Sequence, residues 1–461
     1  MTDACAFLDE VLDDEQVSRR EHAREERSGD WSTAPEAAVR PDVVVWPEST
    51  DEVSAVLAAA DERGVPVTPY AAGTGLEGGA LPAQQGISMD MTRMDEVLAV
   101  RPADLQVDVR PGVLGSAVDE AVESHGLFFP PLPSSGDIST IGGMIATDAS
   151  GMQTVKYGEV ADWVLELEAV LADGTVVTAG SKARKTSAGY NLKDMVVGNE
   201  GTLAVVTRAT LDLAGRPRQI RGGRAVFESL ATAGAAIADA VQSGVDVAKI
   251  ELVGPFAAQL ANAYAGTDLP DSPMVFVEFH ADHGIENEID FCRTVFGAHD
   301  PIAFEMAADE EMDELWQLRK DMAYALDEYD PDLRPVHPGD VTVPIGSFPD
   351  IVRFARERAD EADLPMACYG HAGDGNLHYE ILVDPDDPEM VDRGEAVYAA
   401  IVEQAIEMDG TATGEHGIGL GKREFLEREH GAGAVRAMRS IKDALDPNGT
   451  LNPGKIFSDE E

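Results

Sequence analysis

The apolar and polar positions at the start of the chain alternate between strand-like runs and helix-like spacing. The run 42–46 predicts a strand, and Ser49-Thr-Asp-Glu52 has the residues of a capping box that opens a helix. That helix ends at Gly64, before a second predicted strand at 65–70. Its apolar face consists of Val53, Val56, Leu57 and Ala60. The pattern therefore predicts a strand-helix-strand unit that leads directly into a glycine-rich loop at 71–80.

The loop 71–80 contains Gly73-x-Gly75-x-x-Gly78, which matches the dinucleotide-binding fingerprint in residue type and spacing. That fingerprint requires a helix to begin at the loop, because the helix N-terminus holds the pyrophosphate. Here Pro82 and a predicted strand at 86–91 follow instead. We therefore reject a Rossmann site and expect a nest of backbone N–H groups suited to a diphosphate. A glycine-rich turn with a purely structural role is the alternative.

Glycine and hydroxyl residues gather again further along the chain. A helix predicted at 113–124 leads to 133–151, where small and hydroxyl residues follow one another almost without interruption. Such a segment neither packs a core nor forms a long helix, so we expect it to line a ligand. A hairpin is predicted at 163–177 and a tight loop at 187–192, and the segment 198–206 is expected to run from a loop into a strand.

After Arg216-Pro217 the pattern changes to strands that alternate with helices. Strands are predicted at 224–227, 248–253, 274–279 and 341–344. Helices are predicted up to about 243, after 253, at 309–328 and at 347–361. This order indicates an α+β layer, with an antiparallel sheet on one side and helices on the other.

Two histidines seven residues apart stand out in 370–378, Gly-His-Ala-Gly-Asp-Gly-Asn-Leu-His. The flanking runs read as strands, and a hairpin turning on Asp374-Gly375 would place His371 opposite His378, with Cβ atoms about 5 Å apart. Two opposed imidazoles can share one cation, and Glu415 and His416, in a glycine-bounded loop, offer a third ligand. A histidine pair without metal is the alternative.

The charge of the chain excludes some partners. Its 461 residues include 85 acidic and 35 basic residues, for a formal charge of −50. Such a field excludes nucleic acid and anionic membranes as electrostatic partners. The acids are scattered through the whole chain, which suits a protein from a halophile, kept soluble in concentrated salt; an acidic mesophilic enzyme is the alternative.

The cysteines and the hydropathy point to a cytoplasmic protein. The three cysteines are Cys5, Cys292 and Cys368; they are too far apart for a CxxC pair, and their number argues against a disulfide framework or an iron–sulfur cluster. No apolar run has the length of a membrane span, and the N-terminus lacks the pattern of a signal peptide. We therefore expect a cytoplasmic protein without a transmembrane segment.

Several of these motifs, in this order, resemble one flavoprotein family. The loop 73–79, together with Ile141-Gly-Gly-Met144, 187–192 and Gly198-Asn-Glu-Gly-Thr-Leu203, is similar to the FAD domain of the vanillyl-alcohol-oxidase class. The motifs at 370–378, 414–419 and 445–457 resemble its D-lactate dehydrogenase and glycolate oxidase large-subunit branch. The resemblance covers about 40–457. It implies a two-part FAD-binding domain and an α+β substrate cap with an antiparallel sheet.

The resemblance also implies which residues bind FAD. These are Tyr70, Ala72, Gly73, Thr74, Gly75, Leu76, Gly78, Gly79, Gly136, Asp137, Thr140, Gly142, Gly143, Ala146, Ser150, Gly151, Glu200, Gly201, Val206 and Asn452. Some relatives attach the flavin through a histidine in the pyrophosphate loop. No histidine occurs between 66 and 86 here, so we expect non-covalent FAD.

By the same resemblance, His371, His378 and Glu415 bind a divalent cation, for which zinc, manganese and iron are candidates. His416 is the candidate base, and Arg319 the candidate clamp on a substrate carboxylate. Relatives that oxidise 2-hydroxyglutarate carry a lysine two residues before the Asp340-Val341 pair. Pro338 stands there in this chain, which argues against a dicarboxylate.

These features predict an FAD- and metal-dependent dehydrogenase of D-2-hydroxy acids, D-lactate first, with glycolate or D-2-hydroxyglutarate as alternatives. Two other hypotheses remain. One is a flavin-free metal-dependent hydrolase that uses His371, His378 and Glu415, and the other is a non-catalytic subunit of a larger oxidase. The electron acceptor is open and could be a quinone-linked protein, a cytochrome or oxygen; the oligomeric state is open too.

The expected domain order follows the resemblance. We expect an N-terminal leader at 1–39, an FAD-binding domain at 40–216, a substrate-binding cap at 217–410, and a return to the FAD domain at 411–461.

Overall fold

The computed structural model describes residues 5–330 and 332–458, which form two compact units. The first unit contains residues 5–150, 159–216 and 415–458, and the second contains Gly151–Gly158 together with the chain from Pro217 to Gly414. The short segment Gly151–Gly158 therefore lies outside the first unit, although it falls within the range 40–216. None of the helices in the described part of the chain has the length and apolar character that crossing a membrane requires.

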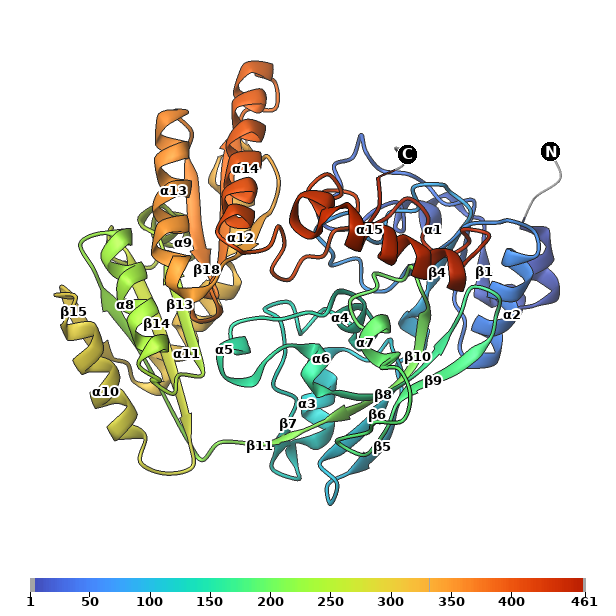
Figure 1. The fold of residues 1–461 in the computed structure, drawn as a ribbon, viewed down its shortest axis with the longest axis horizontal. Helices are drawn as coiled ribbons and strands as arrows, with labels where there is room; N and C mark the ends of the chain where they lie inside the picture. The colour runs from blue at the N-terminus through green and yellow to red at the C-terminus, as the bar shows by residue number, and fades with distance from the viewer. Residues whose placement is uncertain (1–4, 331, 459–461) are drawn as a thin grey trace. The chain divides into compact units, whose positions relative to one another are not determined.

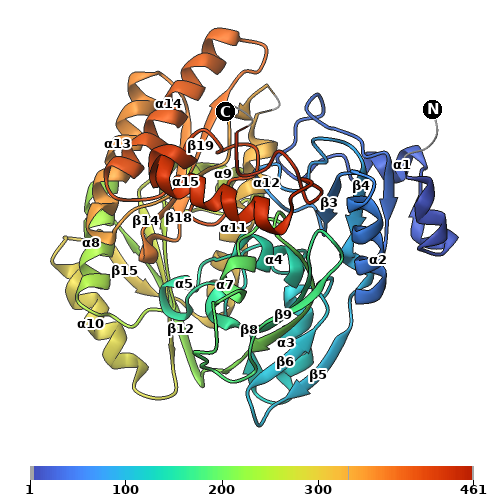
Figure 2. The ribbon, with the colours of Figure 1, turned by 45° about the vertical axis from the view of Figure 1, so that its right-hand side comes forward.

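A sheet in the order β1-β2-β4-β3 begins the first unit. Its strands are β1 (Val17–Ser18), β2 (Val43–Val45), β3 (Val67–Tyr70) and β4 (Ile87–Asp90). β2 and β3 both run parallel to β4, and α2 (Thr50–Asp61), beside this sheet in Figure 2, connects β2 to β3. The four apolar residues of the predicted face of α2 are fully buried. The predicted strand-helix-strand unit is therefore confirmed.

The capping box of α2 forms only in part. The Ser49 side chain accepts the Glu52 amide at 3.3 Å, as expected for an N-cap. The Glu52 carboxylate accepts the amide of Glu48 instead of that of Ser49. No helix begins in the loop that follows β3, and β4 comes next, so the rejection of a Rossmann site is also confirmed.

A five-stranded antiparallel sheet in the order β5-β6-β10-β8-β9 forms the rest of the first unit. Its strands are β5 (Val97–Arg101), β6 (Gln106–Val109), β8 (Val164–Val170), β9 (Val176–Gly180) and β10 (Val205–Asp212). A separate two-stranded sheet pairs β7 (Leu127–Phe128) with β11 (Ala214–Gly215). The accompanying helices are α1 (Glu21–Glu25), α3 (Gly115–Glu123), α4 (Ile141–Thr147), α6 (Val160–Trp163) and α7 (Lys193–Val196). The predicted hairpin at 163–177 is the β8–β9 pair.

The segment 133–151 differs in part from the expectation. It contains no long helix, but α4 forms within it, and Ile141, Met144 and Ile145 of α4 are buried in the hydrophobic core over this sheet. The expectation that this segment packs no core was therefore wrong for these three residues and for Ala149, which belongs to the same core. The reason is that its few large apolar residues share one side of a short helix, a period that the surrounding glycines and hydroxyl residues obscure.

The C-terminal part of the chain returns to the first unit. Helix α15 (Leu426–Leu445) has a kink at Gly431, where φ is 75°. Beyond it, Leu451 forms a parallel bridge with Val67 of β3, and the Asn452 amide donates to the Val67 carbonyl at 2.8 Å. These contacts hold the chain end against the strand that precedes the glycine-rich loop.

The second unit is built on one sheet in the order β15-β12-β14-β13-β18-β19-β16, with β17 also paired to β19. Its strands are β12 (Gln219–Val226), β13 (Lys249–Val253), β14 (Met274–Ala281), β15 (Ala303–Met306), β16 (Arg334–Pro335), β17 (Gly339–Thr342), β18 (Met366–Gly370) and β19 (Asn376–Val383). All of the pairings are antiparallel, as predicted.

Helices cover both faces of this sheet rather than one. On one face lie α8 (Leu230–Gln242), α10 (Ile285–Gly297) and α13 (Phe348–Glu361), which Figure 1 shows side by side. On the other face, Trp316 of α11 packs edge-on against Phe276 of β14. This second layer consists of α9 (Pro255–Ala265), α11 (Asp309–Lys320) and α12 (Met322–Tyr329). The helix predicted at 309–328 is thus two helices, because the backbone of Asp321 leaves the helical region (φ −78°, ψ 1°).

The other α-helices in the described part of this unit are the short helix α5 (Thr154–Tyr157) and the long helix α14 (Pro388–Glu407).

The β18–β19 hairpin has a different register from the predicted one. His378 pairs with Tyr369 rather than with His371, and the loop is a 3-10 turn at Ala372–Asp374 followed by Gly375 in the left-handed region (φ 86°). The register is shifted by two residues. Because side chains alternate with a period of two, that shift keeps His378 on the predicted face.

Candidate functional site

His371 and His378 lie side by side where β18 and β19 meet their connecting loop. The ring centroids are 5.1 Å apart and the rings are perpendicular. His371 Nδ1 lies 2.7 Å from Glu251 Oε1, and both residues are buried. His378 Nδ1 lies 3.3 Å from the carbonyl oxygen of Gly339. Since a carboxylate and a carbonyl only accept, each Nδ1 carries the proton and the lone pair is on Nε2, which is the usual state of a metal-ligating histidine. These two residues therefore fit a divalent cation.

Glu251 connects His371 to Arg319. It lies in β13, is fully buried, and accepts from His371 Nδ1 through Oε1 and from Arg319 Nε, at 2.8 Å, through Oε2. Arg319 comes from α11, is 4% exposed, and lies over the ring of Tyr369 at 4.7 Å from its centroid.

The Nη2 atom of Arg319 is buried and has no hydrogen-bond partner among the described residues. Buried guanidinium donors are normally paired, so this donor suits an anionic ligand such as a carboxylate.

Asp340 holds the segment that leads to Glu415. It lies in β17, is fully buried, and accepts the Asn376 side-chain amide at 2.7 Å. Its other oxygen accepts the Thr413 hydroxyl at 2.9 Å and the Gly414 amide at 2.8 Å. A Cβ at Gly414 would collide with the Asn376 amide, so only glycine permits this close approach.

Glu415 and His416 follow directly in the chain and belong to the first unit. Ser150 donates to Glu415 Oε2 at 3.0 Å. His416 Nδ1 lies 3.8 Å from Glu77 Oε1, and Lys422 Nζ lies 3.3 Å from the same oxygen. Glu77 belongs to the glycine-rich loop, so that loop contacts the candidate base as well as offering a diphosphate nest.

The glycine-rich loop has the shape of an anion cradle. Gly73 and Gly78 have φ of 68° and 73°, and a Cβ at Gly73 would collide with the Tyr70 hydroxyl. A cavity of about 450 Å³ borders the loop and is lined by Tyr70, Ala72, Gly73, Thr74 and Ile138, together with residues between Glu25 and Ala38. Backbone amides in such a left-handed turn can converge on an anion, so this part of the first unit fits the diphosphate of FAD.

Other predicted FAD residues converge on the same loop. Thr74 Oγ1 lies 3.1 Å from the hydroxyl of Ser139, in the segment before α4. The Asn452 side-chain amide donates to the carbonyls of Gly79, at 3.0 Å, and Glu200, at 2.7 Å. The Glu200 amide in turn donates to the carbonyl of Ala146 in α4. Segments far apart in the sequence are thus brought together within the first unit.

Glu200 supports the loop that follows Glu415. Its carboxylate accepts the amides of Ile418 and Gly419 at 2.8 and 2.7 Å. Burial raises the pKa of Glu200 to about 7; the charge of Glu77 adds to this shift, and the two amide bonds oppose it. Burial also lowers the pKa of Lys455 to about 8.

Two of the predicted FAD residues are placed differently from the others. Val206 lies in β10 with its side chain in the hydrophobic core, so only its backbone could face a ligand. Gly151 belongs to the second unit.

Sequence reasoning missed Glu251, Asp340 and Glu77 as functional residues. Glu251 is the one acid in the short strand Lys-Ile-Glu-Leu-Val, and an acid between apolar residues of a strand is a signal that could have identified it; Asp340, in Gly-Asp-Val-Thr, has no such signal.

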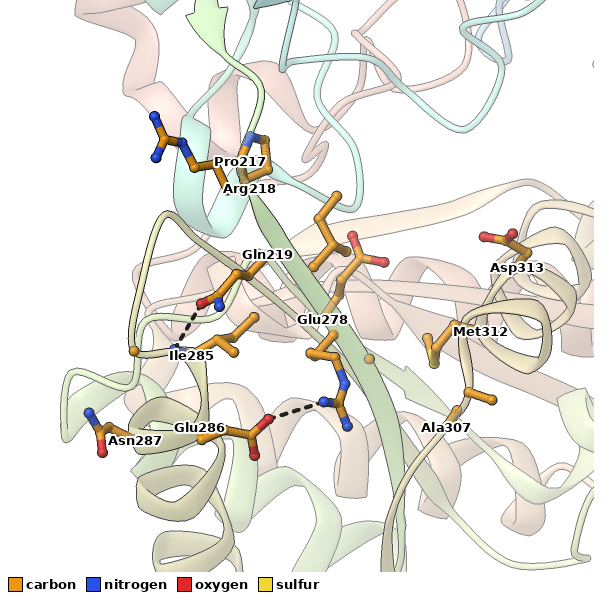
Figure 3. A pocket seen from close by; sticks show the side chains of 15 residues that line it. Pro217, Arg218, Gln219, Glu278, Ile285, Glu286, Asn287, Ala307, Met312 and Asp313 are labelled. Carbon is orange, nitrogen blue, oxygen red and sulfur yellow. Dashed lines mark hydrogen bonds and ion pairs between the residues drawn. The ribbon is translucent and has the colours of Figure 1, made fainter. Parts of the chain in front are cut away.

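A second cavity, of about 1020 Å³, lies in the second unit and is shown in Figure 3. It is bordered by the start of β12, Glu278 of β14 and the first turns of α10 and α11, and none of the predicted site residues lines it. Its charged groups are of both signs, and Arg221 is already paired with Glu286 at 3.0 Å; a dashed line at Glu286 marks an interaction in Figure 3. We assign this cavity no ligand.

Comparison with protein families gives two matches. Residues 41–180 match the FAD binding domain, and residues 216–456 match the C-terminal domain of FAD linked oxidases.

The chain is similar to three proteins over most of its length. It is 37% identical to a probable mitochondrial D-lactate dehydrogenase of Danio rerio, over 97% of this chain and 90% of that protein. It is 36% identical to a cytochrome-type mitochondrial D-lactate dehydrogenase of Arabidopsis thaliana, over 90% and 73%. It is 34% identical to the glycolate oxidase subunit GlcD of Bacillus subtilis, over 96% and 95%.

Solved structures share the fold at low sequence identity. p-Cresol methylhydroxylase with bound substrate has a TM-score of 0.80 at 16% identity, over 99% of this chain and 96% of that one. The 4-ethylphenol oxidase of Gulosibacter chungangensis has a TM-score of 0.79 at 18% identity, over 99% and 97%. These likenesses confirm the predicted fold class.

Proposed function

The chain belongs to the family of FAD-linked oxidases, in the group of D-lactate dehydrogenases and glycolate oxidase subunits, and from this premise we propose that it oxidises D-lactate to the 2-oxo acid. The observation that carries the proposal is the buried set His371, Glu251 and Arg319 in the second unit. It combines a metal-ligating type of histidine with a buried guanidinium that has a donor to spare. A 2-hydroxy acid has a hydroxyl for a cation and a carboxylate for an arginine.

FAD would be held without a covalent bond by the glycine-rich loop at 71–79, the segment before α4 and Asn452. When bound, FAD supplies at its N5 atom the acceptor for the hydride from C2 of the substrate. The loop contains no histidine, and the cavity beside it is lined by none, which supports non-covalent binding. The family assignment also removes the basis for a flavin-free hydrolase.

His371, His378 and Glu415 would hold the divalent cation. A cation held there would lower the pKa of a bound hydroxyl. The two imidazoles and one carboxylate form a set that zinc accepts and that manganese or iron tolerates. The position of Glu415 in the chain supports it as the third ligand. It directly follows Gly414, whose backbone amide donates a hydrogen bond to Asp340.

The protein residues would orient the substrate and accept one proton. Arg319 would bind the substrate carboxylate through the donor that lacks a protein partner. His416 would accept the hydroxyl proton, and the proton would go to Nε2 because Nδ1 faces Glu77. The C2 hydrogen leaves as a hydride in the same reaction, so the product is the 2-oxo acid.

The substrate is a small D-2-hydroxy monocarboxylate in this proposal. Two of the relatives named above are D-lactate dehydrogenases and one is a glycolate oxidase subunit, so glycolate is the second candidate. Pro338 stands where a second carboxylate would need a cation, which disfavours D-2-hydroxyglutarate. A cytochrome is the proposed electron acceptor, since one of the relatives is of the cytochrome type.

An anaerobic visible spectrum tests this proposal. The protein is purified in molar salt and mixed with D-lactate, L-lactate, glycolate or D-2-hydroxyglutarate, each with and without chelator. We expect D-lactate to bleach the flavin band, and we expect the chelator to abolish bleaching. Bleaching by none of the four acids, in a protein that carries flavin and metal, would refute the proposal.

A further inference from the structure

Glu251, in the second unit, contacts both the candidate metal ligand His371 and the candidate substrate clamp Arg319. Its two oxygens are used separately, Oε1 at 2.7 Å from His371 Nδ1 and Oε2 at 2.8 Å from Arg319 Nε. Neither residue is its neighbour in the chain, since the first directly follows β18 and the second lies in α11. A single carboxylate therefore joins three separate elements.

We propose that Glu251 is a positioning residue. It holds the metal ligand His371 and the carboxylate clamp Arg319 of the proposed oxidation in fixed positions relative to each other. The inference rests on the proposed function for the identity of the two ligands, and on the geometry for the role of Glu251 itself. By accepting from His371 Nδ1, Glu251 keeps the Nε2 lone pair available for a cation. By accepting from Arg319 Nε, it directs the remaining edge of the guanidinium away from itself.

The surroundings leave Glu251 little freedom. Its side chain has no exposed surface, and its neighbours on the same face of the sheet include Lys249 two residues before it and Phe276 opposite it. Tyr369 lies under the Arg319 guanidinium and fixes its plane. A shift of the carboxylate would therefore move both partners together, which is how one residue can couple metal position to substrate position.

The neighbouring strand offers a matched control. Glu278 in β14 is also buried, and it also bridges a cation and a histidine, with Lys249 Nζ at 2.9 Å and His280 Nε2 at 2.8 Å. Neither of these partners is a candidate ligand or clamp. Glu278→Gln thus removes a buried carboxylate of the same kind without touching His371 or Arg319.

Two substitutions at Glu251 separate positioning from charge balance. In Glu251→Gln the amide can accept from only one of the two donors, because its NH₂ end would face the other donor. Glu251→Asp keeps the charge but draws the carboxylate back by one methylene group, so it cannot reach both partners. Charge balance alone predicts that Asp restores normal behaviour, whereas positioning predicts that it does not.

The experiment uses the full chain loaded with FAD, with FAD content and the thermal transition as checks of folding. Metal is removed with a chelator, and Zn²⁺ is returned against a competing chelator to obtain its Kd without substrate. We expect Glu251→Gln to weaken zinc binding about 10- to 100-fold, and Glu251→Asp to weaken it at least about threefold. We expect Glu278→Gln to stay within about twofold of the wild type.

A second measurement, KM for D-lactate, reports on the position of Arg319. With zinc saturating, KM for D-lactate should rise about tenfold or more in both Glu251 variants, because Arg319 loses its alignment. Unchanged zinc affinity and KM in Glu251→Asp would overturn the inference. An equal loss in Glu278→Gln would overturn it as well, since any buried carboxylate would then have the same effect.

The outcome can be told apart from failure of the proposed function. If no 2-hydroxy acid reduces the flavin but zinc binding still depends on Glu251, the metal arm of the inference stands and the proposed substrate is wrong. If D-lactate is oxidised and zinc binding is independent of Glu251, the inference alone fails.

Discussion

His371 and His378 present perpendicular imidazole rings with centroids 5.1 Å apart, although their backbones are not opposite each other in the hairpin. The pairing of His378 with Tyr369 places a five-residue connection, 371–375, between the strands, and His371 is the first residue of that connection. The pair therefore depends on the 3-10 turn as much as on the sheet. Gly375, with φ of 86°, is what allows this turn to close.

Replacement of either histidine should remove the metal. We expect His371→Ala and His378→Ala each to weaken Zn²⁺ binding about 100-fold or more, since two ligands hold a divalent cation far less well than three. Equilibrium dialysis of the FAD-loaded protein against zinc measures this. His280→Ala is the control, because His280 is also buried but bonds Tyr157 and Glu278 instead. Zinc retained at normal affinity by both site variants would place the metal elsewhere.

Arg319→Lys should impair use of the substrate. A guanidinium is planar and has separate N–H donors, so it can contact Glu251 and a substrate carboxylate in a fixed geometry. The ammonium group of a lysine cannot hold both partners in that geometry. We expect kcat/KM for D-lactate to fall at least about tenfold, mostly through KM, with the flavin content unchanged. Arg224→Lys, on β12 of the same sheet and 3.7 Å from Glu305, serves as the control and should stay within about twofold. Steady-state kinetics with an artificial acceptor checks both variants, and equal KM values in the two would refute the assignment.

Asn452→Ala should weaken FAD binding. Its side-chain amide donates to the carbonyls of Gly79 and Glu200 and so joins two of the loops proposed to hold the cofactor. We expect the Kd for FAD to rise about tenfold, corresponding to the loss of one or two hydrogen bonds of about 1 kcal/mol each. Flavin release followed by fluorescence measures it. Asn448→Ala nearby, which removes only an exposed contact with Asp61, should retain FAD normally.

Glu200 should make stability depend on pH below neutrality. Because its pKa is about 7 in the folded protein, above that of an unfolded glutamate, the folded state binds the extra proton between about pH 4.5 and 7. This contribution to stability is therefore fully present below about pH 4.5 and is lost as the pH rises through about 7. Urea unfolding of wild type and Glu200→Gln at pH 5, 6, 7 and 8 measures the effect. We expect the difference between the two proteins to change with pH in this direction, and a constant difference would contradict it.

The charge of −50 should make the protein more stable in salt. Screening shortens the range of repulsion between the 85 acidic side chains from about 10 Å at 0.1 M to about 3 Å at 1 M. We expect Tm to rise by roughly 5 °C or more between 0.1 and 2 M KCl. Sucrose at equal osmolality controls for solute exclusion, which does not screen charge. A Tm that rises equally in sucrose would show that screening is not the cause.

Local features of the sequence were sufficient for much of the fold. The helix face of Val53, Val56 and Leu57 and the strand-helix-strand unit depend on periodicity and capping within a few residues, so they could be predicted. The absence of a helix after the glycine-rich loop followed from Pro82 and the next strand. The hairpin register and the break at Asp321 could not be predicted, because both depend on small backbone changes whose energies compete with tertiary packing.

By itself, the sequence determined the strand-helix-strand unit, the glycine-rich loop and the His371–His378 pair as candidates, since each is encoded by local periodicity or by a contiguous motif. The resemblance of several motifs in order added the family, the two-part FAD-binding domain and Arg319 as a candidate. Only the tertiary structure decided that Glu251 joins His371 to Arg319 and that Asp340 anchors Gly414. The physical reason is that such contacts join residues tens of positions apart. A buried carboxylate acquires its partners only when separate strands and helices pack around it, and no local pattern in the chain specifies which ones they will be.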